Sequence, residues 1–277
     1  MLQLLQLCRL LSHSWARPHL RIFYFHGIEK PYVGSFCAFL DHFSQFFTWV
    51  SLSEATALLE SGSLAGPMGV ITFDDADRSV HENALPILAE RRVPFCIFAV
   101  PQYLDLGLTF RERNPRFVMS WDALSECVAA GAEIGNHSYS HPNLSACSEQ
   151  TLREEVLRGK AVLEDRLGRS VVHFAYPYGQ FTKRTIRAIK ELGCCRTQAT
   201  TFRGQMIAGH DLHCLRRDRV DLDCSLEQVE CIMRLADRFY CLRTLRKLWN
   251  CWVPRGGIVA GFARKGEKQK GSSDYSC

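Results

Sequence analysis

Short apolar runs alternate with longer helical patterns along most of the chain. Runs of β-branched and aromatic residues predict strands at 20–25, 69–73, 95–100, 132–136, 171–175, 195–200 and 258–262. Apolar residues at helical spacing predict helices at 53–60, 148–167, 182–192 and 223–249. Strands that alternate with helices are typical of a parallel α/β fold, whose active sites lie at the carboxyl ends of the strands.

Polar side chains capable of chemistry directly follow four of the predicted strands. They are His26, the pair Asp74 and Asp75, the pair His137 and His141, and the Tyr-Pro-Tyr-Gly segment 176–179. Because the loops after parallel strands gather at one rim of such a fold, we expect these residues to form a single site.

Two imidazoles and one carboxylate at this rim predict a metal site. Asp75, His137 and His141 would hold a divalent ion and leave positions open, as catalytic sites require. Water at such an ion has a lowered pKa and becomes a nucleophile near neutral pH, and Asp74 is left to act as the base. Zinc is the default metal for this donor set, and cobalt, nickel and manganese also fit it.

Taken singly, each of these features has an ordinary alternative. An Asp-Asp pair after a strand is most often a helix cap beside a solvated neighbour, and most H-x-x-x-H spacings in loops hold no metal. Pro142 disfavours a helical conformation at His141, so the two histidines do not simply share a helix face. The coincidence of all these features at strand ends favours the metal site.

Three segments, in this order, resemble the polysaccharide deacetylases of carbohydrate esterase family 4. They are Thr-Phe-Asp-Asp at 72–75, Glu-Ile-Gly-Asn-His-Ser-Tyr-Ser-His-Pro at 133–142, and Phe-Ala-Tyr-Pro-Tyr-Gly at 174–179. Shorter similarities lie at 24–26, 82–86, 120–124 and 215–217, so the resemblance covers about 21–262.

The resemblance implies a distorted (β/α) barrel of about seven strands in a single domain. It also implies hydrolysis of the acetamide of N-acetylglucosamine-type sugars with a bound divalent metal. By position, Asp74 matches the catalytic base of the family, and Asp75, His137 and His141 match its metal ligands. The backbone N–H of Tyr178, which follows the motif proline, matches the oxyanion donor.

Two departures from the family pattern concern the proposed catalytic residues, while Ala76 and Asp77 stand where glycine and an aromatic residue are common. Ala175 stands where many members have an arginine that holds the base; we expect Arg217 to supply this charge, the alternative being a surface arginine. The general acid of the family is usually a histidine after a late strand, but no histidine follows His213. His26 resembles that motif moved to the front, as in a circularly permuted branch, and is our candidate acid; the alternative is a buried structural histidine.

Composition narrows the class of protein further. The 277 residues are 47% hydrophobic, which excludes a disordered chain, and a net charge of +5 without a basic stripe argues against nucleic-acid binding. The 13 cysteines include no C-x-x-C pair, so we expect mostly free thiols in a reducing compartment. Polar residues interrupt the Leu-rich start, and we therefore expect a cytoplasmic protein without a signal peptide or a transmembrane segment.

These observations divide the chain into an N-terminal extension at 1–20, a catalytic domain at 21–263 and a disordered basic tail at 264–277. The basic cluster at 243–247, with Trp249 and Trp252, is a solvated helix face or a peripheral membrane contact. The predicted partner is a polymeric or lipid-linked carbohydrate, and the oligomeric state is left open. Two alternatives to N-deacetylation are a carbohydrate-binding barrel without catalysis and an O-deacetylase acting on sugar esters.

Overall fold

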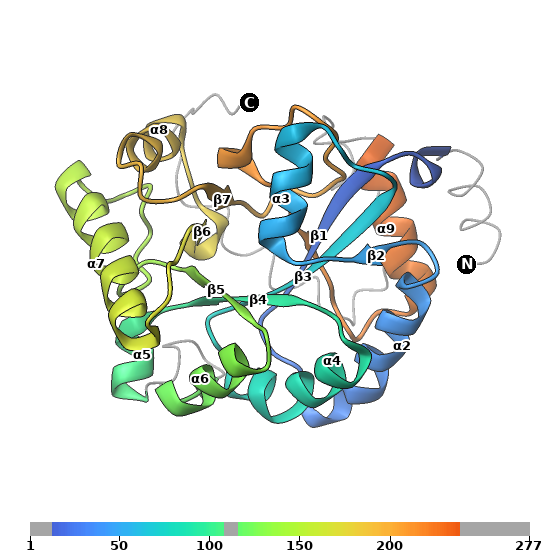
Figure 1. The fold of residues 1–277 in the computed structure, drawn as a ribbon, viewed down its shortest axis with the longest axis horizontal. Coiled ribbons are helices and arrows are strands. Elements are labelled where there is room, and N and C mark those ends of the chain that lie inside the picture. Colours follow the sequence, from blue (N-terminus) through green and yellow to red (C-terminus); the bar gives the residue numbers. More distant parts are fainter. Residues whose placement is uncertain (1–12, 108–115, 239–277) are drawn as a thin grey trace, which may run out of the picture. The chain divides into compact units, whose positions relative to one another are not determined.

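A parallel β-sheet, curved into a partial barrel, organises the protein (Figure 1). The computed structural model describes residues 13–107 and 116–238. The sheet order is β7-β6-β5-β4-β3-β1-β8, with β2 pairing to β3, and every pairing between these strands is parallel. The strands are β1 (His19–Phe25), β2 (Thr48–Trp49), β3 (Pro67–Asp74), β4 (Phe95–Ala99), β5 (Glu133–Asn136), β6 (His173–Ala175), β7 (Thr197–Ala199) and β8 (Asp218–Arg219). The predicted α/β barrel is confirmed.

Residues 215–219 fill the gap between the two ends of the sheet. Leu215 forms a parallel bridge with Ala199 of β7, and β8 pairs with Phe23 and Tyr24 of β1. Because β1 and β7 otherwise lie at opposite ends of the strand order, this short segment brings the barrel close to closure.

Helices surround the barrel (Figure 1). They are α2 (Val33–Phe43), α3 (Leu52–Ser61), α4 (Leu85–Arg91), α5 (Pro101–Leu106), α6 (Trp121–Ala129), α7 (Glu149–Leu167), α8 (Lys183–Glu191) and α9 (Leu226–Arg238). Short turns of 3₁₀ or π helix are η1 (His13–Ala16), η2 (Lys30–Tyr32), η3 (Val80–Ala84), η4 (Pro177–Gly179) and η5 (Leu212–Cys214).

Side chains from opposite faces of the strands belong to different apolar clusters. Phe23 and Phe73 point outward and pack against helices such as α2, whereas Ile22 and Val70 point into the barrel. Leu59 and its neighbours on α3 pack against the inward set. This alternation follows from the two-residue period of a strand, and it leaves the carboxyl ends of the strands for polar residues.

Serine or threonine side chains cap the starts of three of the predicted helices, with the cap of α3 two residues before the expected start at Ser53, and glycines end two of them. The side chains of Ser51, Ser148 and Thr182 accept a hydrogen bond from the backbone N–H three residues on, at the starts of α3, α7 and α8. Gly62 and Gly168 adopt left-handed conformations and end α3 and α7.

A buried ion network attaches α9 to the closing segment of the barrel. The fully buried guanidinium of Arg21 on β1 contacts Asp218 of β8 at 2.5 Å and Asp237 of α9 at 2.5 Å. Asp237 also accepts a hydrogen bond from the indole of Trp15 at 3.1 Å. Arg21 therefore joins β1 both to β8 and to α9.

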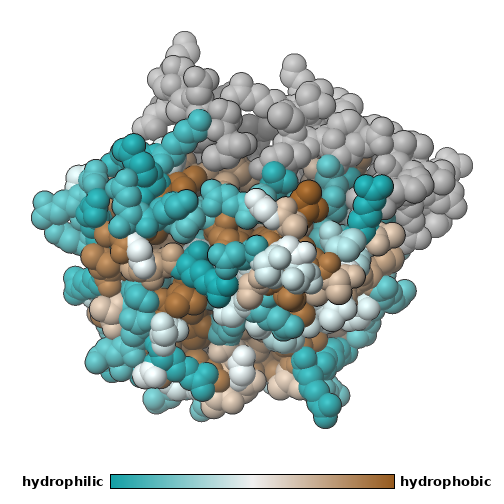
Figure 2. Space-filling view, turned by 45° about the horizontal axis from the view of Figure 1, so that its top comes forward, coloured by the Kyte–Doolittle hydropathy of each residue, from teal (hydrophilic) through white to brown (hydrophobic). Residues whose placement is uncertain are grey.

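Several predictions fall on residues that the structure does not describe. They are the strand at 258–262, the end of the helix at 223–249, the basic cluster at 243–247 and the tail at 264–277. The first strand begins at His19, and the proposed division of the chain into three parts stays a prediction. Within the described ranges, no helix combines the length and the apolar character needed to cross a membrane. On the face seen in Figure 2, hydrophobic residues are interspersed with hydrophilic ones.

Candidate active site

The residues predicted to form the site lie next to strand ends, at one rim of the barrel. Asp74 is the last residue of β3, with Asp75 next to it, and His137 directly follows β5. His26 follows β1, and Arg217 immediately precedes β8. The loop after β5 also carries His141, and η4 after β6 carries Tyr178.

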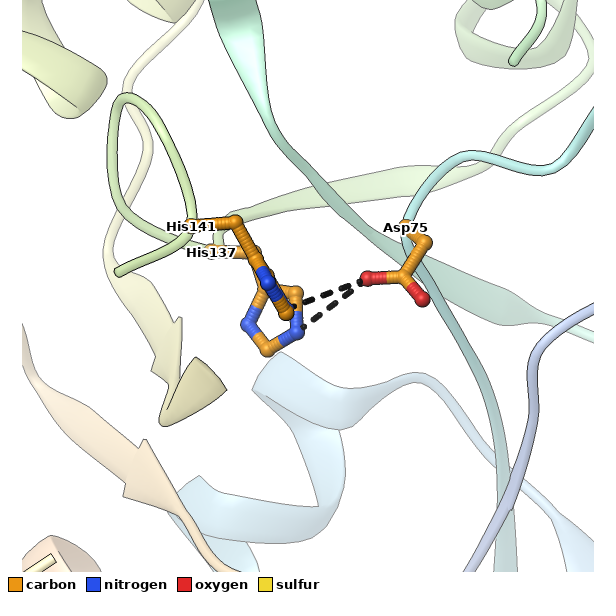
Figure 3. A group of neighbouring side chains, drawn as sticks. All are labelled: Asp75, His137 and His141. Carbon is orange, nitrogen blue, oxygen red and sulfur yellow. Dashed lines mark ion pairs between the residues drawn. The ribbon is translucent and has the colours of Figure 1, made fainter. Parts of the chain in front are cut away.

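Asp75, His137 and His141 form a compact buried group (Figure 3). The Oδ1 atom of Asp75 lies 3.5 Å from Nε2 of His137 and 3.5 Å from Nε2 of His141. Zinc–ligand bonds of about 2.1 Å in tetrahedral geometry place two ligand atoms about 3.4 Å apart. The potential ligand atoms all lie within 4.8 Å of one another, so the group fits a single divalent ion.

The hydrogen bonds and charges of this group also suit a cation. Nδ1 of His137 lies 2.7 Å from the carbonyl oxygen of Ala175, which assigns the proton to Nδ1 and leaves the Nε2 lone pair facing Asp75. Oδ1 of Asp75 is buried and accepts no hydrogen bond from the described residues. Burial and the Asp74 carboxylate raise the pKa of Asp75, whereas burial lowers the pKa of both imidazoles. These surroundings disfavour the ionised form of the Asp75 carboxylate, and a bound cation would compensate its negative charge.

Arg217 forms a bidentate ion pair with Asp74. Its Nη1 and Nη2 atoms lie 2.6 and 2.9 Å from the two carboxylate oxygens, and its Nε donates to the carbonyl of Thr200 at 3.0 Å. The guanidinium is fully buried, so Arg217 is not a surface arginine, which was the alternative to its role beside the base. Burial alone would raise the pKa of Asp74, but attraction to Arg217, with contributions from His137 and His26, lowers this pKa to about 2. Asp74 is thus ionised and held in one orientation.

His26 lies on the other side of the Asp75 carboxylate. Its Nε2 is 3.7 Å from Oδ2 of Asp75, and its side chain is 34% exposed. Desolvation lowers the pKa of His26 to about 4, so the ring is neutral near pH 7. As an acid it would have to gain a proton during the reaction before giving it up.

The Pro177–Tyr178 turn brings a backbone segment beside the histidines. Tyr178 has a left-handed conformation with φ of 58°, and its ring lies 4.5 Å from that of His141, centroid to centroid. Gly179 follows with φ of 62°, and a Cβ there would meet the Thr201 side chain at 2.2 Å. The turn therefore requires glycine at this position.

Unusual backbone conformations gather at this rim. Six non-glycine residues of the described ranges have positive φ, and five lie here: Asp75, Ala76, Ser138, His141 and Tyr178. The sixth, Arg92, ends α4. Such conformations cost about 1–3 kcal/mol each and persist where the surroundings impose them, as is common at functional sites.

The contacts that hold the histidine loop against α7 were not found by sequence reasoning. Glu155 and Gly159 of α7 carry them. Gly159 was the available signal for these contacts. A glycine inside a regular helical pattern weakens the helix, and its presence there often has a packing reason.

Comparison with known proteins agrees with the resemblance predicted from the motifs. Residues 62–196 match the family model described as polysaccharide deacetylase. A chitooligosaccharide deacetylase of Sinorhizobium fredii is 31% identical over 115 residues, which are 41% of this chain and 47% of the relative. A poly-beta-1,6-N-acetyl-D-glucosamine N-deacetylase of Staphylococcus aureus is 28% identical over 162 residues, 55% of this chain and 53% of the relative. The chain thus spans about half the length of these curated relatives.

Solved structures share the fold over a larger part of the chain. IcaB from Ammonifex degensii superposes with a TM-score of 0.65 at 25% identity, covering 79% of this chain and 98% of that one. The Streptococcus pyogenes deacetylase PplD, solved in complex with acetate, gives a TM-score of 0.66 at 20% identity, covering 75% and 94%. The PplD likeness supports the barrel fold.

Proposed function

We propose that this member of the polysaccharide deacetylase family is a metal-dependent hydrolase that removes N-acetyl groups from N-acetylglucosamine-type sugars. The observation that carries the proposal is the buried Asp75, His137 and His141 group beside an Asp74 carboxylate held by Arg217. One carboxylate faces the metal position, and a second, ionised carboxylate stands next to it as a base. The named relatives act on chitooligosaccharide or poly-N-acetylglucosamine, which supports a polymeric or lipid-linked sugar as substrate.

Asp75, His137 and His141 would hold the metal. A divalent ion bound there would lower the pKa of water and polarise a carbonyl group. The three donors are those that zinc prefers, and cobalt, nickel and manganese accept the same set.

The other residues of the site transfer protons or stabilise the developing negative charge. Asp74 takes the proton of the attacking water, and the bidentate contact with Arg217 keeps its carboxylate oriented for that step. The backbone N–H of Tyr178 donates to the oxyanion that develops on the acetamide oxygen. The proton that Asp74 takes from water is passed on through His26 to the leaving amine as the C–N bond breaks, so His26 gains and loses one proton in each turnover.

Acetate release tests the proposal directly. The purified chain is stripped of metal, reloaded with Zn²⁺ or Co²⁺, and incubated with β-1,4- and β-1,6-linked N-acetylglucosamine oligomers and with O-acetylated sugars. We expect acetate from the oligomers with the loaded protein and none after chelation. Release from esters alone would indicate an O-deacetylase. A protein that binds metal but releases no acetate from any substrate contradicts the enzyme and supports a binding barrel.

The His26→Gln variant tests the acid. Glutamine keeps much of the size and polarity of the ring but cannot shuttle a proton, so we expect kcat to fall by about 100-fold or more while metal affinity stays unchanged. The decrease should shrink for substrates with a good leaving group, such as aryl acetates, because these need no proton. An equal decrease for amide and aryl ester substrates would assign His26 a structural role.

A further inference from the structure

Helix α7 holds the loop that carries both histidines. The carboxylate of Glu155 accepts two hydrogen bonds from Ser140, from its backbone N–H at 2.8 Å and from its hydroxyl at 2.7 Å. The backbone carbonyl of Glu155 accepts a third, from the N–H of Tyr139 at 3.0 Å. Both bonded residues lie between His137 and His141, so one helical residue contacts the middle of the loop.

A glycine one turn further along α7 allows the loop to approach this closely. A Cβ at Gly159 would lie 2.9 Å from the backbone carbon of Ser138 and 2.9 Å from the nitrogen of Tyr139. It would also lie 2.5 Å from Oδ1 of Asn136. Glycine lowers helix stability by about 1 kcal/mol relative to alanine, and here it is the residue that leaves room for the loop.

The loop needs such support because its backbone is strained. Ser138 and His141 have φ of 66° and 60°, and the Ser138 hydroxyl accepts a hydrogen bond from the His141 N–H at 3.0 Å. Without external contacts, a loop of non-glycine residues in these conformations would relax and move the two imidazoles apart.

We propose that Glu155 is a positioning residue for the metal site, which sets the separation of the His137 and His141 imidazoles through its hydrogen bonds to Ser140. The inference rests on the proposed function in assigning a metal to these histidines. Glu155 itself neither ligates nor touches the reacting atoms; it holds the loop from outside. Outer contacts of this kind contribute about 10- to 100-fold to metal affinity in other sites.

The test compares Glu155→Ala and Glu155→Gln with the control Glu154→Ala. Glu154 is the exposed neighbour on α7, and its carboxylate accepts a hydrogen bond from Gln150 of the same helix at 2.9 Å. Zinc affinity is measured by competition with a chromophoric chelator, and the site geometry by the visible absorption of the Co²⁺-loaded protein. We expect Glu155→Ala to bind zinc about 10- to 100-fold more weakly with an altered cobalt spectrum. Glutamine keeps an acceptor for the Ser140 N–H, so Glu155→Gln should fall between the wild type and the alanine variant.

Gly159→Ala gives a second measurement that does not depend on removing a hydrogen bond. Alanine favours the helix but forces the loop away, so we expect weaker zinc binding even if thermal stability is retained or rises. Gly34→Ala in α2 is the matched control, because a Cβ there meets no atom of the described residues within 4 Å beyond its own helical turn.

The outcomes separate this inference from the proposed function. Wild-type zinc affinity and an unchanged cobalt spectrum in both Glu155→Ala and Gly159→Ala would overturn the positioning role while leaving the enzyme proposal intact. A wild-type protein that binds neither zinc nor cobalt would overturn both. A folded Glu155→Ala protein, checked by circular dichroism, with weakened metal binding supports the inference.

Discussion

Replacing Asp74 with asparagine is expected to lower kcat for acetate release by about two to four orders of magnitude, the usual contribution of a general base. The amide has nearly the same shape as the carboxylate but cannot take a proton from water. Metal affinity should change little, because Asp75, His137 and His141 remain. Loss of a nearby negative charge weakens attraction for the cation, but the same loss makes Asp75 easier to ionise, so the two effects oppose each other.

The measurement is steady-state acetate release together with zinc titration of the same preparation. Asp41→Asn serves as the control, because the Asp41 side chain is 66% exposed and contacts Arg91 at the surface. Activity within tenfold of the wild type, with metal fully bound, would exclude Asp74 as the base. Loss of both activity and metal would instead show that Asp74 helps to hold the ion.

The location of the site could be predicted from sequence because it follows from two local rules. Apolar runs mark buried strands, and polar residues directly after them lie at the carboxyl edge of a parallel sheet. Asp75 and His137 are adjacent to the ends of β3 and β5, which pair with β4 on either side, so their meeting follows from strand order alone. The histidine loop was also correctly expected to be non-helical, because Pro142 restricts His141.

The closing segment could not be predicted as a strand. Its sequence, Leu-Arg-Arg-Asp-Arg at 215–219, has the charge density of an exposed loop. Arg217 and Asp218 are nonetheless buried, because Asp74 and Arg21, distant in sequence, pair with them in the folded protein. Buried charges of this kind depend on partners that only the folded chain brings together, and local hydrophobicity carries no information about them.

Some helices and loop conformations were also beyond the sequence pattern. Helices α4 and α5 have seven and six residues, too few to establish a period of 3.6. Helix α2 carries four buried apolar residues, yet its Phe-rich sequence also suits a strand. The left-handed conformations of Asp75 and Tyr178 arise from tertiary contacts, because neither residue type prefers them strongly enough to decide.

The Arg217–Asp74 pair provides the largest expected effect on stability. Removing either partner leaves a buried charge without its counter-ion, so Arg217→Met and Asp74→Asn are each expected to lower the free energy of unfolding by about 3–5 kcal/mol. The double variant removes both charges and should be destabilised by much less than the sum of the two. Chemical denaturation of the metal-free protein, with chelator present, measures these values without a contribution from a bound cation.

A surface pair supplies the matched comparison for this cycle. Arg196 and Glu60 lie 2.8 Å apart, a distance within the range of the Arg217–Asp74 contacts, but their side chains are 42% and 60% exposed, and such pairs contribute about 0–1 kcal/mol. A coupling energy for Arg217 and Asp74 no larger than that for Arg196 and Glu60 would contradict the buried pairing. If the coupling is large and Arg217→Met also loses activity with metal still bound, Arg217 both stabilises the barrel closure and orients the base. One buried guanidinium can fill both roles because it joins the closing segment at 215–219 to the end of β3.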